Sequence, residues 1–461
     1  MDFPIFHLDL LGNRMLIAIT AIIHVLINHP LAVGAYPLIT LLEWWGLRKG
    51  EPAWDKLAYR IVFIVFIITT TVGALTGVGI WLTTSLVAPF AIGSLLRVFF
   101  WGWFVEWLVF ISEVGLIMAY YLTWKRFATP RLKRLHVAIG ATLSAFSWIT
   151  MALIVAILGF MMNSGAWTQD KSLWSAMFNP LYLPQLAFRT PYSMFTAGLF
   201  VWFCIFFVTK RDDPIRPRAI RLVAIWTLAW LPFVVLGAFW YWRSVPASMQ
   251  ANANVALLTQ AFSQWHGMFI KIIGWTVAAV AVIALVGAVR PRALPRYVLL
   301  VPFVLAIWLL GHFERVREFI RKPYVIADYM YANGVRVAAL PVYQRDGILP
   351  YATYSAVKQA TPANALVAGH EVFMLTCSRC HTTAGMNNVI TKLEHIYGRE
   401  PWDQDALVGF IQGMHLTRTY MPPFPGNEAE ASALATYLKS LQRPAPAAST
   451  APAPAAVAAA R

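Results

Sequence analysis

The chain has 461 residues, of which 59% are hydrophobic and 13% are charged, and its formal net charge is +16. Soluble domains carry about 25% charged residues, so this composition excludes an ordinary soluble protein. A basic chain can bind nucleic acid, but within the apolar part of this chain the positive charge gathers in alternate loops between the long apolar runs. We therefore expect no nucleic-acid partner.

Apolar runs long enough to cross a bilayer follow one another from about residue 14 to 313. The first run is too long for a cleavable signal peptide and has no basic leader. The sequence predicts an all-α, polytopic membrane bundle in contact with lipid, over residues 1–325. The expected helices span residues 14–42, 57–88, 94–124, 135–163, 186–209, 219–243, 265–289 and 295–313.

Lysine and arginine gather in alternate loops of this bundle, after the first, third, fifth and seventh expected helices. The loop after the third helix alone holds Lys125, Arg126, Arg131, Lys133 and Arg134. Basic loops lie on the cytoplasmic side of a membrane. We therefore expect a multi-pass protein of the bacterial inner (cytoplasmic) membrane, with its N-terminus and, after eight crossings, its C-terminal region on the periplasmic side.

Ionisable residues within the expected helices are candidates for function, because a charge inside lipid is costly. His24 lies mid-way along the first helix, and Glu106 and Glu113 lie seven residues apart on one face of the third. Neutral imidazole binds haem iron, so His24 is predicted to hold a b- or d-type haem, with a structural hydrogen bond as the alternative. The two carboxyl groups suit proton transfer, or else are buried hydrogen-bonding acids.

Two further histidines lie near the ends of expected helices. His266 begins the seventh helix and His312 ends the eighth. Each is a candidate haem ligand, with a structural role equally open. His29 and His136 are expected to be structural or interfacial.

The segment that follows the bundle starts with the charged run Glu314 to Lys322. We expect most of this run to form a collar at the outer membrane surface. Residues 326–366 are expected to be a periplasmic linker, and the Ala/Pro-rich residues 444–461 a disordered tail.

The decisive motif is Cys377-Ser378-Arg379-Cys380-His381. C-x-x-C-H is the attachment signature of a c-type haem, in which the two sulfurs bond to the porphyrin and His381 ligates the iron. A zinc site would need a second pair of ligands, and the only other cysteine, Cys204, lies in an apolar run. A redox dithiol would gain nothing from the adjacent histidine.

A methionine is the usual second iron ligand of an electron-transfer haem c. Met421, in the loop Met421-Pro422-Pro423-Phe424, is the best candidate, and Met414 is the runner-up. The outside candidates are His370, His395 and His415. With its helix before the motif and its closing helix ending at Ala435-Thr436-Tyr437-Leu438, the stretch 367–443 resembles a small class I monohaem cytochrome c.

The first part of the chain resembles subunit I of the cytochrome bd quinol oxidases. The residues that carry the resemblance are Ile19-Thr20-Ala21-Ile22-Ile23-His24, the Gly-rich stretch Gly73 to Gly79, Glu113-Val114-Gly115-Leu116, Leu143-Ser144-Ala145-Phe146 and Arg321-Lys322-Pro323-Tyr324. The resemblance implies that His24 is an axial ligand of an active-site haem. It also implies that Glu113 is one of two proton-path glutamates, with Glu106 one position off the other.

The sequence also departs from that family. The family's fifth-helix histidine, a ligand of a low-spin b haem, falls on Arg189, and the family's long quinol-binding loop is reduced to residues 244–264. The glutamate that ligates a b haem on the eighth helix aligns near Gly311, beside His312. A cytochrome c domain replaces the family's ninth helix.

These observations predict a membrane respiratory electron-transfer protein. Haem c would exchange electrons with a periplasmic cytochrome or other redox partner, and the bundle would hold b- or d-type haem and reduce oxygen or another small molecule. The alternatives are a quinol-oxidising subunit with electrons flowing outward, and a haem-poor anchor within a larger respiratory complex. Further membrane subunits are expected partners in each case.

Overall fold

The computed structural model describes residues 3–258 and 266–443, and it describes no side chains at 257–258 and 266–270. The expected tail at 444–461 lies outside the described residues. The chain forms two compact units. The bundle unit comprises Arg14–Ala339 and Arg418–Pro422. The small unit comprises Met1–Asn13, Leu340–Thr417 and the residues from Pro423 onward. The expected linker is thus divided between the two units after Ala339.

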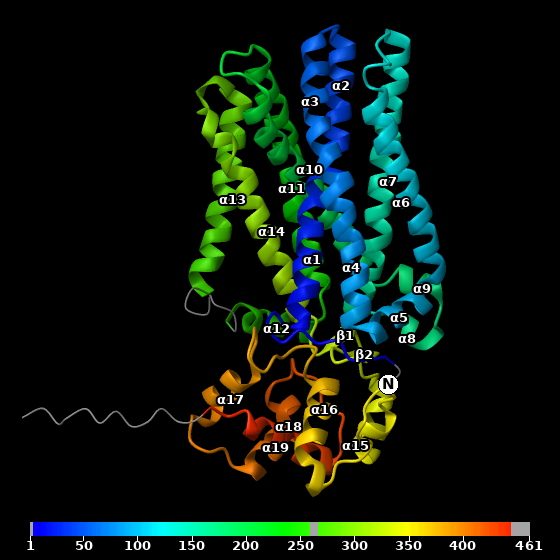
Figure 1. Cartoon of the computed structure of the whole chain (residues 1–461). Coiled ribbons are helices and arrows are strands. Elements are labelled where there is room, and N and C mark those ends of the chain that lie inside the picture. The colour runs from blue at the N-terminus through cyan, green and yellow to red at the C-terminus, as the bar shows by residue number, and fades with distance from the viewer. Residues whose placement is uncertain (1–2, 259–265, 444–461) are drawn as a thin grey trace, which may run out of the picture. The chain divides into compact units, whose positions relative to one another are not determined.

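Eight helical spans among the described residues are long and apolar enough to cross a membrane (Figure 1). The all-α class and the number of spans are therefore confirmed. Two spans are composite: α1 (Asn13–Ile27), η1 (Asn28–Val33) and α2 (Ala35–Lys49) form the first, and α3 (Pro52–Ile68), η2 (Thr69–Gly73) and α4 (Ala74–Val87) form the second. The others are built from α6 (Phe100–Thr123), α7 (Pro130–Met162), α10 (Tyr182–Val208), α11 (Ile215–Ser244), α13 (His266–Val289) and α14 (Val301–Ile320).

The segments η1 and η2 are π-helical turns inside otherwise α-helical spans. Wider turns shift the hydrogen-bond ladder, and they are frequent at functional sites. In η2 the threonines hydrogen-bond backwards to the helix, as Thr69 Oγ1 donates to Val65 O at 2.9 Å. Such bonds keep backbone carbonyls paired where lipid offers no water.

The third expected helix is shorter than predicted. Its first residues form a separate helix, α5 (Pro89–Val98), with Arg97 in its last turn, and the chain turns at Phe99 before α6 begins. The run of apolar residues continues across this turn, so hydropathy could not show it. Three more short helices connect spans: α8 (Trp167–Asp170), α9 (Leu173–Met177) and α12 (Ala247–Leu258).

The eighth span continues through the charged run that was expected to form a surface collar. Helix α14 ends only at Ile320, and Glu314 within it is 4% exposed. Glu314 is buried because it pairs with Arg189 of the neighbouring helix α10, and the collar expected for most of the run stays a prediction. After α14 the chain makes a small antiparallel hairpin of β1 (Tyr324–Ile326) and β2 (Met330–Tyr331), in which Tyr324 pairs with Tyr331.

Helix α10 is the most enclosed span, and it packs against α11, η1, α7 and α14. Glycines allow these close approaches. A Cβ atom on Gly34 would lie 2.1 Å from Ser193 O, and one on Gly237 would lie 2.3 Å from Ala187 O. Small residues at crossings let membrane helices pack closely, where dispersion rather than the hydrophobic effect holds them together.

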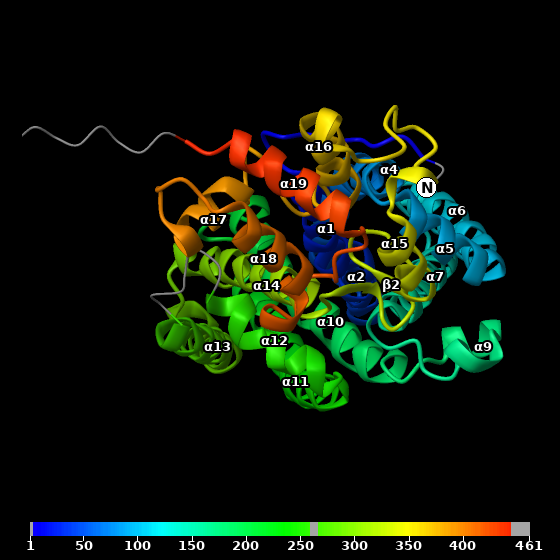
Figure 2. The same ribbon diagram turned by 90° about the horizontal axis from the view of Figure 1, so that it is seen from below.

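The small unit consists of short helices, of which two pack closely against each other. Its α-helices are α15 (Leu340–Asp346), α16 (Ala365–Thr376), α17 (Val389–Tyr397), α18 (Gln404–Thr417) and α19 (Glu428–Ser440), and its 3₁₀ turns are η7 (Leu349–Tyr351) and η8 (Pro362–Asn364). Helices α16 and α19 lie side by side (Figure 2). They approach closely at Gly369, where a Cβ atom would lie 2.0 Å from Ala433 O.

The N-terminal segment belongs to the small unit through a clamp at Asp9. Its carboxylate accepts hydrogen bonds from Thr383 N at 2.6 Å, Thr383 Oγ1 at 3.0 Å and Ala384 N at 3.0 Å. Two residues later in that loop, Met386 N donates to Leu10 O at 3.1 Å. The segment therefore holds the loop that directly follows His381.

We predict that the clamp at Asp9 releases in acid. Partial burial opposes ionisation, but the bonds from Thr383, His7 and Ala384 outweigh it and hold the pKa of Asp9 below its usual 3.8. A depressed pKa stabilises the folded state above the ordinary value, and this stabilisation is lost as pH falls through the folded value. Below pH 3.8 the protection of the Thr383 and Ala384 amides against hydrogen exchange, taken relative to the intrinsic rate at each pH, should fall in the wild type.

Asp9→Asn should give fast exchange at these amides at every pH, while Asp346→Asn, at an exposed ion pair in the same unit, should leave them protected. Equal protection in Asp9→Asn and the wild type would contradict the clamp.

Candidate functional site

The C-x-x-C-H motif forms one turn at the end of α16. Cys377 N donates to Phe373 O at 2.8 Å, and His381 N donates to Cys377 O at 2.9 Å. Burial raises the pKa of the Cys377 thiol to about 11. Redox-active C-x-x-C thiols have lowered pKa values, so this environment is unlike that of a dithiol catalyst. No group of three or more His, Cys, Asp or Glu suited to a metal ion occurs among the described residues.

The ring of His381 is oriented by the backbone of its own loop. Its Nδ1 lies 3.2 Å from Asn387 O, and Asn387 Nδ2 donates to Cys380 O at 2.6 Å. A carbonyl oxygen only accepts, so this contact assigns the proton to Nδ1, and Nε2 then carries the lone pair that iron needs. A ligating histidine is held in this way in most metal sites. Cys377, Cys380 and His381 therefore fit a covalent haem c.

The M-P-P-F loop lies between α18 and α19. Its Phe424 is buried, and Phe424 O accepts a hydrogen bond from Gln344 Nε2 at 3.1 Å. Met421 lies in a turn closed by its own N–H to Arg418 O at 2.7 Å. The other candidates for the second iron ligand of haem c lie on helices: His370 on α16, His395 on α17, and Met414 and His415 on α18.

His24 lies on α1 against the π-helical turn of the second span. Its Nδ1 is 3.2 Å from Gly73 O and 3.1 Å from Thr76 Oγ1, and its Nε2 is 2.5 Å from Asn28 Nδ2. A Cβ atom on Gly77 would lie 3.1 Å from the His24 ring, so this position needs a small residue. The carbonyl of Gly73 assigns the proton to Nδ1 and leaves Nε2 as the basic nitrogen. In this structure Nε2 accepts the Asn28 amide, and a haem iron would take the place of that hydrogen bond, while the contacts of Nδ1 orient the ring as a haem ligand requires.

The two other candidate histidines are less defined. The ring of His312 lies 4.5 Å from that of Trp308, edge to face, and is half-buried. His266 begins α13, and its side chain lies outside the described residues. Their roles stay predictions.

Glu113 and Glu106 lie on one face of α6, as expected. Glu113 is 6% exposed and accepts hydrogen bonds from Ser147 Oγ at 2.7 Å and from Thr150 Oγ1 at 2.8 Å, both on α7. Glu106 is half-buried and interacts electrostatically with Glu113. His24 and Glu113 therefore bond to different neighbours, η2 and α4 for the histidine and α7 for the glutamate.

A buried ion-pair network surrounds Arg189, the residue on which the family's fifth-helix histidine was expected to fall from the sequence. Arg189 is 2% exposed; its Nη1 lies 2.9 Å from His29 Nε2, and its Nη2 lies 2.9 Å from Glu314 Oε1. Arg317 Nε donates to Glu314 Oε2 at 2.7 Å. A guanidinium has no lone pair for iron. The residues present at this position therefore do not fit a low-spin haem.

A second cluster, around Glu43 and His136, lies where α2 ends and α7 begins, next to the basic loops. Both residues are fully buried, so His136 pairs with protein groups, as the structural alternative expected for it implies. Sequence analysis missed Glu43 because it lies close to the basic loop 48–56, where a surface position was natural. Its spacing from Tyr36 and Thr40 places all three polar residues on one face of a helix, and this could have indicated a buried polar cluster.

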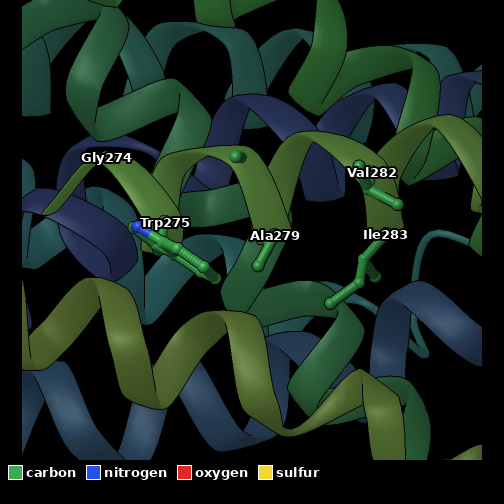
Figure 3. A pocket seen from close by; sticks show the side chains of 6 residues that line it. Gly274, Trp275, Ala279, Val282 and Ile283 are labelled. Carbon is green, nitrogen blue, oxygen red and sulfur yellow. The ribbon is translucent and has the colours of Figure 1, made fainter. Parts of the chain in front are cut away.

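One apolar hollow runs along α13 (Figure 3). Its lining is Gly274, Trp275, Ala278, Ala279, Val282 and Ile283. None of these residues can ligate iron or transfer a proton, and Trp275 is 76% exposed on this lipid-facing helix. We assign it no chemistry.

Comparisons with known proteins agree with this geometry. The family described as Cytochrome bd terminal oxidase subunit I matches residues 13–245, and that described as Cytochrome C oxidase, cbb3-type, subunit III matches residues 364–438. Among solved structures, the chain is similar to one from "The structure of bd oxidase from Geobacillus thermodenitrificans". The TM-score is 0.57 and the identity is 17%, over 69% of this chain and 89% of that chain. No curated protein matches the sequence.

Both resemblances expected from the sequence are thus confirmed. The structural match supports the bundle fold, and the first family match spans slightly more than half of the chain. The chain therefore belongs to the cytochrome bd terminal oxidase subunit I family and carries, in addition, a C-terminal cytochrome c domain.

Proposed function

We propose that this protein is a cytochrome-c-fed terminal reductase. A bd-type bundle joined to a cytochrome c domain is a membrane respiratory electron-transfer protein. In the proposal, electrons enter from a periplasmic cytochrome or similar donor at the small unit and continue to the bundle. Oxygen, or another small molecule such as nitric oxide, is the acceptor. Further membrane subunits complete the complex.

The observation that carries the proposal is the pairing of two oriented histidines in one chain. His381 and His24 are each held by a backbone carbonyl, at Asn387 and Gly73, so that Nε2 is the basic nitrogen. Bound haem supplies one-electron redox chemistry at each position. The chain's residues orient the ligands, and Glu113 with Glu106 is proposed to hand protons to the acceptor side.

The proposed orientation has the N-terminus and the cytochrome c domain on the periplasmic side. Met1–Asn13 and the C-x-x-C-H segment belong to one unit, which agrees with an even number of spans. The concentration of Lys and Arg in the alternate loops supports the cytoplasmic assignment of those loops.

One observation favours the second candidate, a haem-poor electron-carrying anchor. The ion pairs of Arg189 with Glu314 fill a position where the family binds haem. Against this candidate stand His24 and the Gly77 that makes room for it. A quinol-oxidising subunit remains the third reading.

The test of the proposal is acceptor consumption by the purified protein. Oxygen and nitric oxide electrodes should record consumption with reduced cytochrome c as donor and little with a quinol. Consumption with quinol alone would support the reversed flow, and none with either donor would support the anchor.

We predict that Met421→Ala removes the thioether ligand of haem c. The reduction potential of haem c should fall, and the weak sulfur-to-iron absorption band at the red end of the visible spectrum should disappear from the oxidised protein. Met414→Ala is the matched control and should change neither. A band that survives in Met421→Ala would assign the ligand elsewhere.

We predict that His24→Ala removes one b- or d-type haem per chain while haem c stays at one. The imidazole is the ligand, and no other histidine is held at this position by Gly73 and Thr76 among the described residues. Optical spectra and pyridine haemochromes of the variant measure this. A complete bundle spectrum in His24→Ala, alongside a loss in His312→Ala, would move the ligand to α14.

A further inference from the structure

The cluster at the basic-loop end of the bundle is built around a carboxylate and an imidazole. Glu43 Oε1 lies 2.5 Å from His136 Nδ1, and Glu43 Oε2 accepts a hydrogen bond from Tyr120 OH at 2.7 Å. The other ring nitrogen, His136 Nε2, lies 2.8 Å from Tyr120 O. Glu43, His136 and Tyr120 are all 0% exposed.

These contacts fix the number of protons on the pair. A backbone carbonyl only accepts, so His136 Nε2 carries a proton. One further proton must then lie between Nδ1 and Glu43 Oε1, on one atom or the other. The pair is therefore a buried holder of one transferable proton.

The pair has an entrance on its outer side. Lys133 Nζ lies 2.8 Å from Glu43 Oε1 and 2.6 Å from Asp55 Oδ1. The Asp55 side chain is 35% exposed, whereas that of Glu43 is fully buried. Trp124 Nε1 donates to Asp55 Oδ2 at 3.3 Å. Asp55 and Lys133 thus connect the buried pair to the surface at the basic-loop end.

The pair also has an exit toward the centre of the bundle. The hydroxyl of Tyr120 lies 3.4 Å from Thr40 Oγ1. One turn before Thr40 on α2, Tyr36 OH lies 3.2 Å from Thr69 Oγ1. Gly140 makes this crossing possible, because a Cβ atom there would lie 2.4 Å from Thr40 Oγ1 and 2.8 Å from the Tyr120 ring.

The polar groups continue to the glutamate of the proposed proton path. Tyr120 and Glu113 are seven residues apart on α6, so they lie on one face of the helix. Tyr120 and Glu113 share no direct hydrogen bond in the described structure, so the proposed path requires a water between them.

We propose that Glu43 and His136 form a proton-loading pair that takes protons from the Asp55–Lys133 side and passes them through Tyr120 and Thr40 toward Glu113. This proposal rests on the proposed function, in which Glu113 handles protons. It assigns Glu43, His136 and Tyr120 a role in proton supply beyond packing.

Each transfer conserves protons. The proton on the pair moves to the Tyr120 oxygen as the hydroxyl of Tyr120 gives its own proton to Thr40 and Thr40 releases its own proton toward Glu113; rotation of both hydroxyls then resets the chain. A proton from the Asp55 side then reloads the pair. Lys133 stays charged and balances Asp55, and the loaded pair is neutral as a whole, so the cluster carries one net negative charge only between release of the proton and reloading.

The test is proton uptake linked to haem reduction in the full-chain protein with its haems. Reduced hexaammineruthenium, a one-electron donor that releases no proton, is mixed anaerobically with the protein in weakly buffered medium. A pH-indicator dye reports proton uptake while absorbance reports haem reduction. The variants are Glu43→Gln, which removes the proton-holding carboxylate, and Tyr120→Phe, which keeps the ring and removes only the hydroxyl.

Glu51→Gln is the matched control, because Glu51 pairs with Arg218 at the surface near the same loop. Haem content by pyridine haemochrome shows that each variant is assembled. In the wild type and Glu51→Gln, proton uptake should accompany haem reduction. In Glu43→Gln and Tyr120→Phe the uptake should slow at least about tenfold and lose its pH dependence, as expected when a positioned proton donor is removed.

Uptake at the wild-type rate in both Glu43→Gln and Tyr120→Phe, or no uptake in the wild type, overturns the relay. Because the assay needs no acceptor, it separates the two proposals. Slowed uptake in a protein that consumes neither oxygen nor nitric oxide would support the relay and refute the terminal reductase. Wild-type uptake in variants of an active reductase would refute the relay alone.

Discussion

The structure depends on one constraint: an ionisable side chain inside lipid must have a partner of opposite charge or a hydrogen-bond donor aimed at it. The bundle meets this constraint at three levels along its helices. Arg189 pairs with Glu314 across α10 and α14, Glu113 accepts two hydroxyl groups from α7, and Glu43 pairs with Lys133 across α2 and α7. Removing one partner of such a pair leaves a buried charge and costs about 3–5 kcal/mol.

The same constraint explains where the chain departs from the rest of its family. Arg189 stands where the family's low-spin haem ligand was expected from the sequence. Its charge requires Glu314, and Glu314 in turn is shared with Arg317. At His24 no charge has been introduced. That ring is held by Gly73, Thr76 and Asn28 beside a glycine that leaves it room. The two positions therefore differ. Arg189 forms a buried ion pair, whereas His24 presents an oriented basic nitrogen.

The sequence predicted what depends on composition and local motifs: the all-α class, eight spans, the C-x-x-C-H turn and the shared face of Glu106 and Glu113. It could not predict what depends on the pairing of distant helices. The charged run from Glu314 was expected at the membrane surface, since its partner Arg189 is 125 residues away along the chain. His136 was expected to be structural or interfacial, and its buried partner Glu43, 93 residues before it, could not be identified from the sequence. The break at Phe99 left no trace in hydropathy.

The central claim is that one chain joins a covalent haem c to haem chemistry in the bundle. A pyridine haemochrome spectrum of the purified protein tests it most directly, because it counts haem c, b and d per chain. The account predicts one haem c together with at least one b or d haem. One haem c and nothing else would contradict it and would leave a bundle that has kept the bd fold without its redox chemistry.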